Sequence, residues 1–215
     1  MSFGHDHHMP TFAASVEPYD PYQLSIANDD RGWIVDPSRA ALLVHDLLPY
    51  YVDILPPIVR EVVVLETQRL VDWAHEHSIP VVASAPRPAS VLEERGLGGR
   101  LWGLGPSQAE TLTTSLPELG NALWIGKRSY SAFFGTDLAI ELRRLNRDQL
   151  LITGVFTSAG ILATTFDALA NDIEAFVVTD ATADYNRTKH EAALRQVATT
   201  TGAIVSSTTI LKSKN

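Results

Sequence analysis

Short apolar runs alternate with amphipathic segments over most of the chain. The run at 40–44 has no polar interruption, which is the pattern of a strand buried on both faces of a sheet. Comparable runs predict further strands at 79–84, 122–125, 150–153, 175–179 and 204–205. Apolar residues at helical spacing predict intervening helices at 59–77, 137–145, 158–170 and 188–199, with a short helix at the C-terminal end.

This alternation predicts an α/β protein with three αβα layers and a six-stranded, mostly parallel sheet. Apolar strands that are separated by helices need cover on both faces of the sheet. In such folds ligands bind beyond the carboxyl ends of the strands, near the point where the strand order reverses. Polar residues directly after the predicted strands are therefore the first candidates for a functional site.

The domain organisation is simple. Residues 1–38 are broken up by prolines and predicted turns and are expected to form an N-terminal extension. Residues 39–215 contain no internal repeat and no linker, which predicts a single domain. Within it, the segment 86–106 is rich in glycine and proline, and a loop of that length in a compact domain is usually a lid or a binding loop.

Composition narrows the classes of function. The chain has 215 residues, 45% of them hydrophobic, as is typical of a globular protein. Its net charge of −8 argues against nucleic acid or an anionic membrane as partner, although a small anionic substrate remains compatible. The chain contains no cysteine, which excludes disulfides and thiolate nucleophiles. Neither a signal peptide nor a membrane span is recognisable, so we expect a cytoplasmic protein.

Polar residues follow three of the predicted strands. Asp46 ends the first strand, Lys127 follows the third, and a turn from Gly154 to Gly160 follows the fourth. Each residue alone has an ordinary structural interpretation, since such an Asp can cap a loop and such a Lys can lie on the surface. Together, at the ends of two parallel strands, they favour a catalytic site. No phosphate loop, nucleophile elbow or metal-binding set of histidines accompanies them.

Five segments, taken in order, resemble the isochorismatase-like hydrolases. They are 41–46 (ALLVHD), 94–97 (ERGL) with 102–103 (WG), 127–134 (KRSYSAFF), 153–160 (TGVFTSAG) and 178–184 (VTDATAD). Each motif alone is weak, but the similarity is collinear from about residue 19 to residue 211. Their order and spacing together make the resemblance specific.

The resemblance implies a chemistry. Relatives that act as cysteine hydrolases use an Asp, a Lys and a Cys, and the position of that Cys corresponds to Gly160 here. The chain is thus similar to the branch that cleaves enolpyruvyl ethers, with Asp46 as general acid and Lys127 beside it. Arg95 would hold a substrate carboxylate, and Trp102 would either close an apolar wall or pack as an ordinary loop residue. The resemblance further implies a small anionic substrate, no metal or cofactor, and a homodimer.

The pocket departs from the family pattern. Pro86 and Arg87 replace a Gln that contacts substrate, Phe156 replaces a Tyr, and Ser158 stands where a His is usual. Arg87, Phe156, Ser158 and Gly160 are therefore counted among the candidate substrate-binding residues. Two hypotheses remain: hydrolysis of a modified chorismate derivative, or a different substrate or a non-hydrolytic binding role. Retention of the acid, the lysine and the loop arginine favours the first.

Overall fold

The computed structural model describes residues 15–26 and 31–212. Residues 1–14 and 27–30 of the predicted N-terminal extension lie outside that description, as do residues 213–215. In the described ranges, no helix is both long and apolar enough to cross a membrane.

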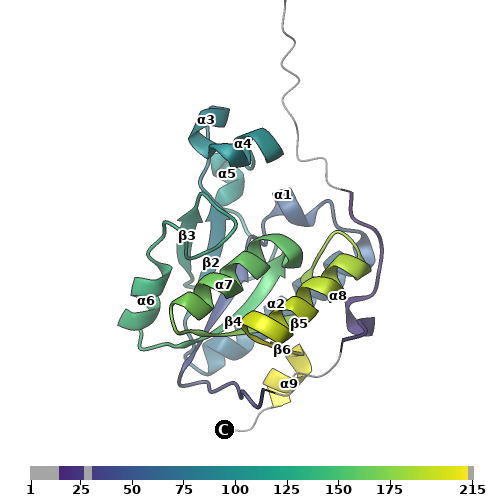
Figure 1. Cartoon of the computed structure of the whole chain (residues 1–215), viewed down its shortest axis with the longest axis vertical. Coiled ribbons are helices and arrows are strands. Elements are labelled where there is room, and N and C mark those ends of the chain that lie inside the picture. Colours follow the sequence, from purple (N-terminus) through teal and green to yellow (C-terminus); the bar gives the residue numbers. More distant parts are fainter. Residues whose placement is uncertain (1–14, 27–30, 213–215) are drawn as a thin grey trace, which may run out of the picture.

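Six parallel strands form one sheet at the centre of the molecule (Figure 1). They are β1 (Ala40–His45), β2 (Val81–Pro86), β3 (Leu123–Lys127), β4 (Gln149–Val155), β5 (Glu174–Ala183) and β6 (Ala203–Val205). The strand order is β3-β2-β1-β4-β5-β6. The predicted six-stranded α/β fold is confirmed, and every strand pair is parallel.

Helices cover both faces of this sheet. The long helix α2 (Pro57–Glu76) and the short α9 (Ser207–Lys212) pack on one face, and the other face carries α6 (Leu138–Arg144), α7 (Leu162–Ala170) and α8 (Arg187–Gln196) (Figure 1). The sheet has a hydrophobic core on each face, and strand β1 contributes to both. Leu42 faces the α2 side and Leu43 faces the opposite side. This two-sided burial explains why the strand is apolar at every position.

The strand order reverses between β1 and β4. From β1 the chain builds outward to β2 and β3, and it then returns to β4 and builds β5 and β6 on the other side. The carboxyl ends of β1 and β4 therefore flank the crevice in which open parallel sheets bind ligands. Asp46 directly follows β1 at this point.

Short helices lie above the carboxyl ends of the strands (Figure 1). They are α1 (Pro49–Val52), α3 (Leu92–Arg95), α4 (Leu97–Trp102) and α5 (Gln108–Thr111). The segment expected to be a long loop thus contains α3 and α4. Glu94 fixes the start of α3 by accepting from the backbone N–H of Ser90 at 2.6 Å. Gly96 and Gly103, with φ of 60° and 71°, end α3 and α4 in conformations that favour glycine.

Residues 15–26 pack onto the domain rather than extending from it. Tyr19 is buried in the core, and its hydroxyl accepts from the backbone N–H of Asp184 at 2.9 Å. Tyr22, in the single-turn helix η1 (Pro21–Gln23), donates to Glu66 Oε1 at 2.6 Å. The described part of the predicted extension is therefore integral to the folded unit.

Candidate active site

Asp46 stands at the end of β1 in an unusual backbone conformation. Its φ of 52° is in the left-handed region, which Asp tolerates better than most side chains. The residue is only 7% exposed. Its Oδ1 accepts from Ser84 Oγ on β2 at 3.0 Å, and its Oδ2 lies 2.7 Å from Lys127 Nζ on β3. Three neighbouring strands thus hold one carboxyl group in place.

Lys127 is as deeply placed as its partner. It is 3% exposed, and its ammonium also donates to the carbonyl of Ser129 at 3.2 Å. The sequence-based expectation that the Asp and the Lys meet at one edge of the sheet is what the geometry shows. A buried ion pair gives up much of its hydration, so it survives only with good geometry and further hydrogen bonds, and this site has both.

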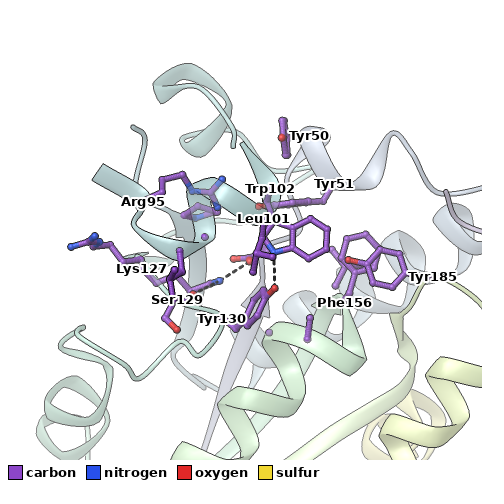
Figure 2. A pocket seen from close by; sticks show the side chains of 18 residues that line it. Tyr50, Tyr51, Arg95, Leu101, Trp102, Lys127, Ser129, Tyr130, Phe156 and Tyr185 are labelled. Atoms are coloured by element: carbon purple, nitrogen blue, oxygen red, sulfur yellow. Dashed lines mark hydrogen bonds and ion pairs between the residues drawn. The ribbon is translucent and has the colours of Figure 1, made fainter. Parts of the chain in front are cut away.

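A cavity of about 250 Å³ opens above this pair. Its lining residues include Asp46, Tyr50, Tyr51, Pro86, Arg95, Leu97, Gly98, Leu101, Trp102, Lys127, Arg128, Ser129, Tyr130, Val155, Phe156, Ala159, Gly160 and Tyr185. Figure 2 shows Arg95 and Lys127 on one side, Phe156 and Tyr185 on the other, and Trp102 between them. The cavity therefore has a cationic side and an aromatic side.

The roof of the cavity is built by α3 and α4. Arg95 donates from Nη1 to the carbonyl of Gly103 at 2.7 Å, which ties the end of α3 to the end of α4. Trp102 donates from Nε1 to the hydroxyl of Tyr130 at 2.6 Å (Figure 2). This bond joins α4 to the segment after β3. The expected lid or binding segment is thus tied within itself by Arg95 and held to the rest of the domain by the bond from Trp102 to Tyr130.

Tight packing shapes the floor of the cavity. A Cβ on Gly154, where φ is 109°, would lie 2.0 Å from the carbonyl oxygen of His45. His45 is fully buried, with Nδ1 3.0 Å from the Val155 carbonyl oxygen and Nε2 3.2 Å from that of Tyr130. Burial lowers the pKa of His45. A π-helical turn, η2 (Thr157–Ile161), then carries Gly160 to the cavity wall, and such turns are frequent at functional sites.

The aromatic side of the cavity is formed by packed rings. The rings of Phe156 and Tyr185 lie 4.4 Å apart at an angle of 6°, and Tyr51 meets Phe156 edge-on at 6.2 Å. Burial raises the pKa of Tyr185 to about 12, so its phenol stays protonated at neutral pH. Behind the stack, the Asp184 carboxylate accepts from the backbone N–H groups of Ser158 at 2.5 Å and Tyr185 at 2.8 Å. Burial raises the pKa of Asp184 as well.

The structure gathers six of the eight predicted site residues around this cavity: Asp46, Arg95, Trp102, Lys127, Phe156 and Gly160. The other two point elsewhere. Arg87 turns back along β3 and donates to the carbonyls of Gly126 at 2.9 Å and Gly135 at 3.1 Å. Ser158 faces the end of β5, where its hydroxyl donates to Asp184 at 3.0 Å. Neither Arg87 nor Ser158 lines the cavity. The prediction that they bind substrate is therefore replaced by a structural role for both.

Several site residues were not predicted, among them Ser84, Tyr51 and Tyr185. Ser84 pairs in register with His45 and donates a hydrogen bond to Asp46. Its position as a polar residue near the end of a predicted strand is the sequence feature that could have identified it. Tyr185 follows β5, which runs beyond its predicted end. Tyr51 lies in α1, shortly after the end of β1. Among the described residues, no group of three or more His, Asp and Glu side chains is placed to hold a metal ion.

Comparison with known proteins identifies the family. The isochorismatase domain matches residues 40–209. The chain is 38% identical over 197 residues to a probable isochorismatase from Pseudomonas chlororaphis, covering 89% of this chain and 94% of that protein. It is 36% identical, with the same coverage of 89% and 94%, to the phenazine biosynthesis protein PhzD of Pseudomonas fluorescens. The chain therefore belongs to the isochorismatase-like hydrolase family.

A solved structure agrees with this fold. An isochorismatase-like hydrolase from Alkaliphilus metalliredigens superposes with a TM-score of 0.69 at 21% sequence identity, covering 82% of this chain and 98% of that one. At this level of identity the likeness concerns the arrangement of helices and strands. It supports the three-layer architecture that the sequence pattern predicts.

Proposed function

We propose that the protein hydrolyses the enolpyruvyl ether of an isochorismate-like or 2-amino-isochorismate-like cyclohexadiene carboxylate, in secondary metabolism. The observation that carries this proposal is the carboxyl group of Asp46, held by Ser84 and Lys127 at the floor of a cavity with a cationic side and an aromatic side. The products are pyruvate and a ring alcohol or amino alcohol. The name of the similar protein from Pseudomonas chlororaphis, a probable isochorismatase, supports the same reaction class, and that of the phenazine biosynthesis protein from Pseudomonas fluorescens supports a role in secondary metabolism.

In this reaction Asp46 is the general acid. It donates a proton to the terminal carbon of the vinyl ether, which makes an oxocarbenium ion. Water adds to that ion and loses a proton, and the resulting hemiketal collapses to pyruvate and the ring alcohol. Protonation of carbon is the slow step, so a positioned acid accelerates the step that limits the rate. Because the backbone of Asp46 and its bond to Ser84 fix the carboxyl group, little reorganisation is needed.

The cations bind the negative charges of the substrate. Lys127 points into the cavity beside Asp46, and a substrate carboxylate at its ammonium competes with Asp46 for the same charge. That competition leaves Asp46 free to carry the proton that the reaction requires. Arg95 and Arg128 also line the cavity and offer planar guanidinium groups for a second carboxylate. The site as a whole thus suits a small dianion despite the net charge of −8.

A specific observation keeps a second candidate open: an altered substrate for the same fold. Pro86 and Phe156 both line the cavity, and neither side chain can form a hydrogen bond with a substituent on the ring. A site without such a donor or acceptor discriminates poorly for a hydroxyl or amino group at that point. The alternative is a ligand whose facing edge is apolar, bound with or without hydrolysis.

A coupled assay decides between these candidates. Wild-type protein is incubated with isochorismate and with its 2-amino analogue, and pyruvate is followed with lactate dehydrogenase and NADH. We expect turnover of at least one substrate, and a loss of about 10³-fold in kcat for Asp46→Asn, the size of effect that a general acid supplies. Asp148→Asn is the control, since Asp148 forms an exposed ion pair with Arg39. No pyruvate from either substrate would exclude the first candidate and leave the second.

Three further properties complete the proposal: a homodimer, no required metal, and a cytoplasmic location. The family resemblance supports the first two, and the absence of cysteine suits the reducing conditions of the cytoplasm. Light scattering coupled to gel filtration measures the oligomeric state. Activity after treatment with a chelator tests the metal requirement, and a fall in turnover that added metal restores would contradict it.

A further inference from the structure

We propose that His45 is a specificity-determining residue: its imidazole fills the space that a side chain at position 160 would enter, and so reserves this site for chemistry without a nucleophile there. By the resemblance to the cysteine hydrolases, position 160 corresponds to that of their thiol. The absence of a thiol in this chain is then a property of two coupled positions rather than of one. The inference rests on packing and does not depend on which substrate the protein cleaves.

The geometry at Gly160 carries the argument. A Cβ built on Gly160 would lie 2.3 Å from Cε1 and 2.9 Å from Nε2 of His45. Real Cβ atoms essentially never approach a heavy atom so closely, so either the imidazole or the turn would have to move. The next nearest atom, the carbonyl oxygen of Tyr130, would lie at 3.1 Å, a tight contact that a small shift relieves. The imidazole is therefore the principal obstacle.

His45 has little freedom to move away. The residue is fully buried, and it belongs to the central strand β1, which pairs on both sides with β2 and β4. Its Nδ1 lies 3.0 Å from the carbonyl oxygen of Val155 and its Nε2 3.2 Å from that of Tyr130. The ring is thus fixed between the end of β4 and the segment after β3. Rotation of the side chain would break both contacts and push the ring into packed core.

The same ring contributes to the placement of the catalytic group. His45 immediately precedes Asp46, and its Nδ1 lies 3.7 Å from Asp46 Oδ2. A side chain at position 160 that displaced the imidazole would therefore also disturb the carboxyl group. Fitting a thiol into this site requires a smaller residue at position 45, so the two positions must change together.

The absence of cysteine makes a clean experiment available. A cysteine introduced at position 160 is the only thiol in the chain, so thiol labelling reports on that position alone. We would prepare Gly160→Cys, His45→Ala and the double variant, and measure the melting temperature and the rate of labelling by iodoacetamide at pH 8. Overpacking by one side chain predicts that Gly160→Cys lowers the melting temperature by about 5 °C in the wild-type background. In the His45→Ala background the same substitution should lower it by less than half as much.

Labelling gives a second readout. With the imidazole removed, the thiol has room to occupy the cavity wall, and we expect the double variant to be labelled about tenfold faster than Gly160→Cys, since access controls thiol reactivity. Gly98→Cys is the matched control, because Gly98 lines the same cavity and has no atom within 4 Å of a built Cβ. It should be labelled readily without a change in melting temperature. A His190→Ala background, which removes another fully buried histidine, should not relieve the effect of Gly160→Cys.

Each outcome decides the proposal. Equal losses of melting temperature on adding Gly160→Cys in the two backgrounds would overturn it. So would a Gly160→Cys variant that is as stable as the double variant and is labelled as fast. If Gly160→Cys does not fold but the double variant does and is labelled, the proposal is supported in its strongest form. If the double variant does not fold while His45→Ala does, the backbone around Tyr130 rather than the imidazole excludes a side chain at position 160, and the proposal is wrong.

Discussion

The ammonium of Lys127 lies 2.7 Å from Oδ2 of Asp46, in a pair whose side chains are 4% and 10% exposed. The two residues are 81 positions apart in the sequence and meet because β1 and β3 are parallel members of one sheet. Such a pair adds little net stability, since both groups lose hydration, but breaking it leaves a charge with no partner. This asymmetry leads to the first prediction.

Lys127→Met keeps an unbranched side chain, one heavy atom shorter, and removes its charge. We expect it to lower the free energy of unfolding by about 3 kcal/mol, because Asp46 is left buried without a counterion. The double variant Asp46→Asn/Lys127→Met should recover part of that loss. Urea denaturation measures both effects. The control is Arg39→Met, which breaks an exposed pair with Asp148 and should cost less than about 1 kcal/mol; losses of equal size in the two single variants would contradict the prediction.

The bond between Trp102 and Tyr130 holds the roof of the cavity to its wall. Trp102→Phe removes the donor and keeps an aromatic ring, and we expect KM for the substrate to rise about tenfold, the effect of losing one to two kcal/mol of positioning. The melting temperature should change little, because the bond lies near the surface of the fold. Tyr130→Phe removes the acceptor and should give the same result, with no additional effect in the double variant. Additive effects would mean that the two residues act separately.

His190 makes the stability of the fold depend on pH. Burial lowers its pKa from 6.5 to about 3, and the neutral ring is satisfied by the Tyr19 hydroxyl and by Thr182 Oγ1, both at 3.0 Å. Below pH 6.5 the unfolded chain binds a proton at this residue that the folded chain does not, so stability falls as pH falls from 6.5 towards 3. The contribution of this one group to the loss at pH 5 is about 2 kcal/mol.

Urea midpoints at pH 7 and pH 5 measure this dependence. His190→Gln has no group that titrates in this range, so its midpoint should change less between the two pH values than that of the wild type. Some dependence should remain in the variant, because burial also lowers the pKa of His45. If the variant and the wild type show the same change, His190 is not the source.

Gly154 tolerates no side chain. With φ at 109° and only 2.0 Å between a built Cβ and the carbonyl oxygen of His45, Gly154→Ala forces β4 away from β1 at the floor of the site. We expect a loss of at least about 3 kcal/mol in the free energy of unfolding, from backbone strain and overpacking together. Gly98→Ala is the contrasting variant, since space is open around it, and should be neutral or slightly stabilising.

The sheet and the meeting of Asp46 with Lys127 were predictable for the same reason. Strands buried on both faces are apolar throughout, and parallel strands bring their carboxyl ends to one edge. The end of β5 was not predictable in this way. The buried Asp180 interrupts its apolar run, and only the structure reveals that Asp180 accepts from Ser207, through Oδ1 from the backbone N–H and Oδ2 from the hydroxyl. The strand consequently continues to Ala183, and Tyr185 follows it.

The directions of individual side chains were also beyond the sequence pattern. Arg87 and Ser158 occupy positions adjacent to site residues, yet the first follows the backbone of β3 and the second is taken up by Asp184. At a strand end the backbone leaves its regular pleat, so the alternation of faces no longer indicates where a side chain points. Proximity in sequence to Pro86 or to Phe156 was therefore insufficient to place them in the cavity.

The burial of Tyr19 limits how far the N-terminal part of this protein can be shortened. The first strand begins at residue 40, so a truncated protein that starts at residue 39 would retain all six strands. Such a version would lose the hydroxyl that accepts from the Asp184 N–H and contacts the ring of His190, directly behind the aromatic wall of the cavity. A deletion that removes residues 15–26 would therefore weaken the wall from behind without altering a single lining residue.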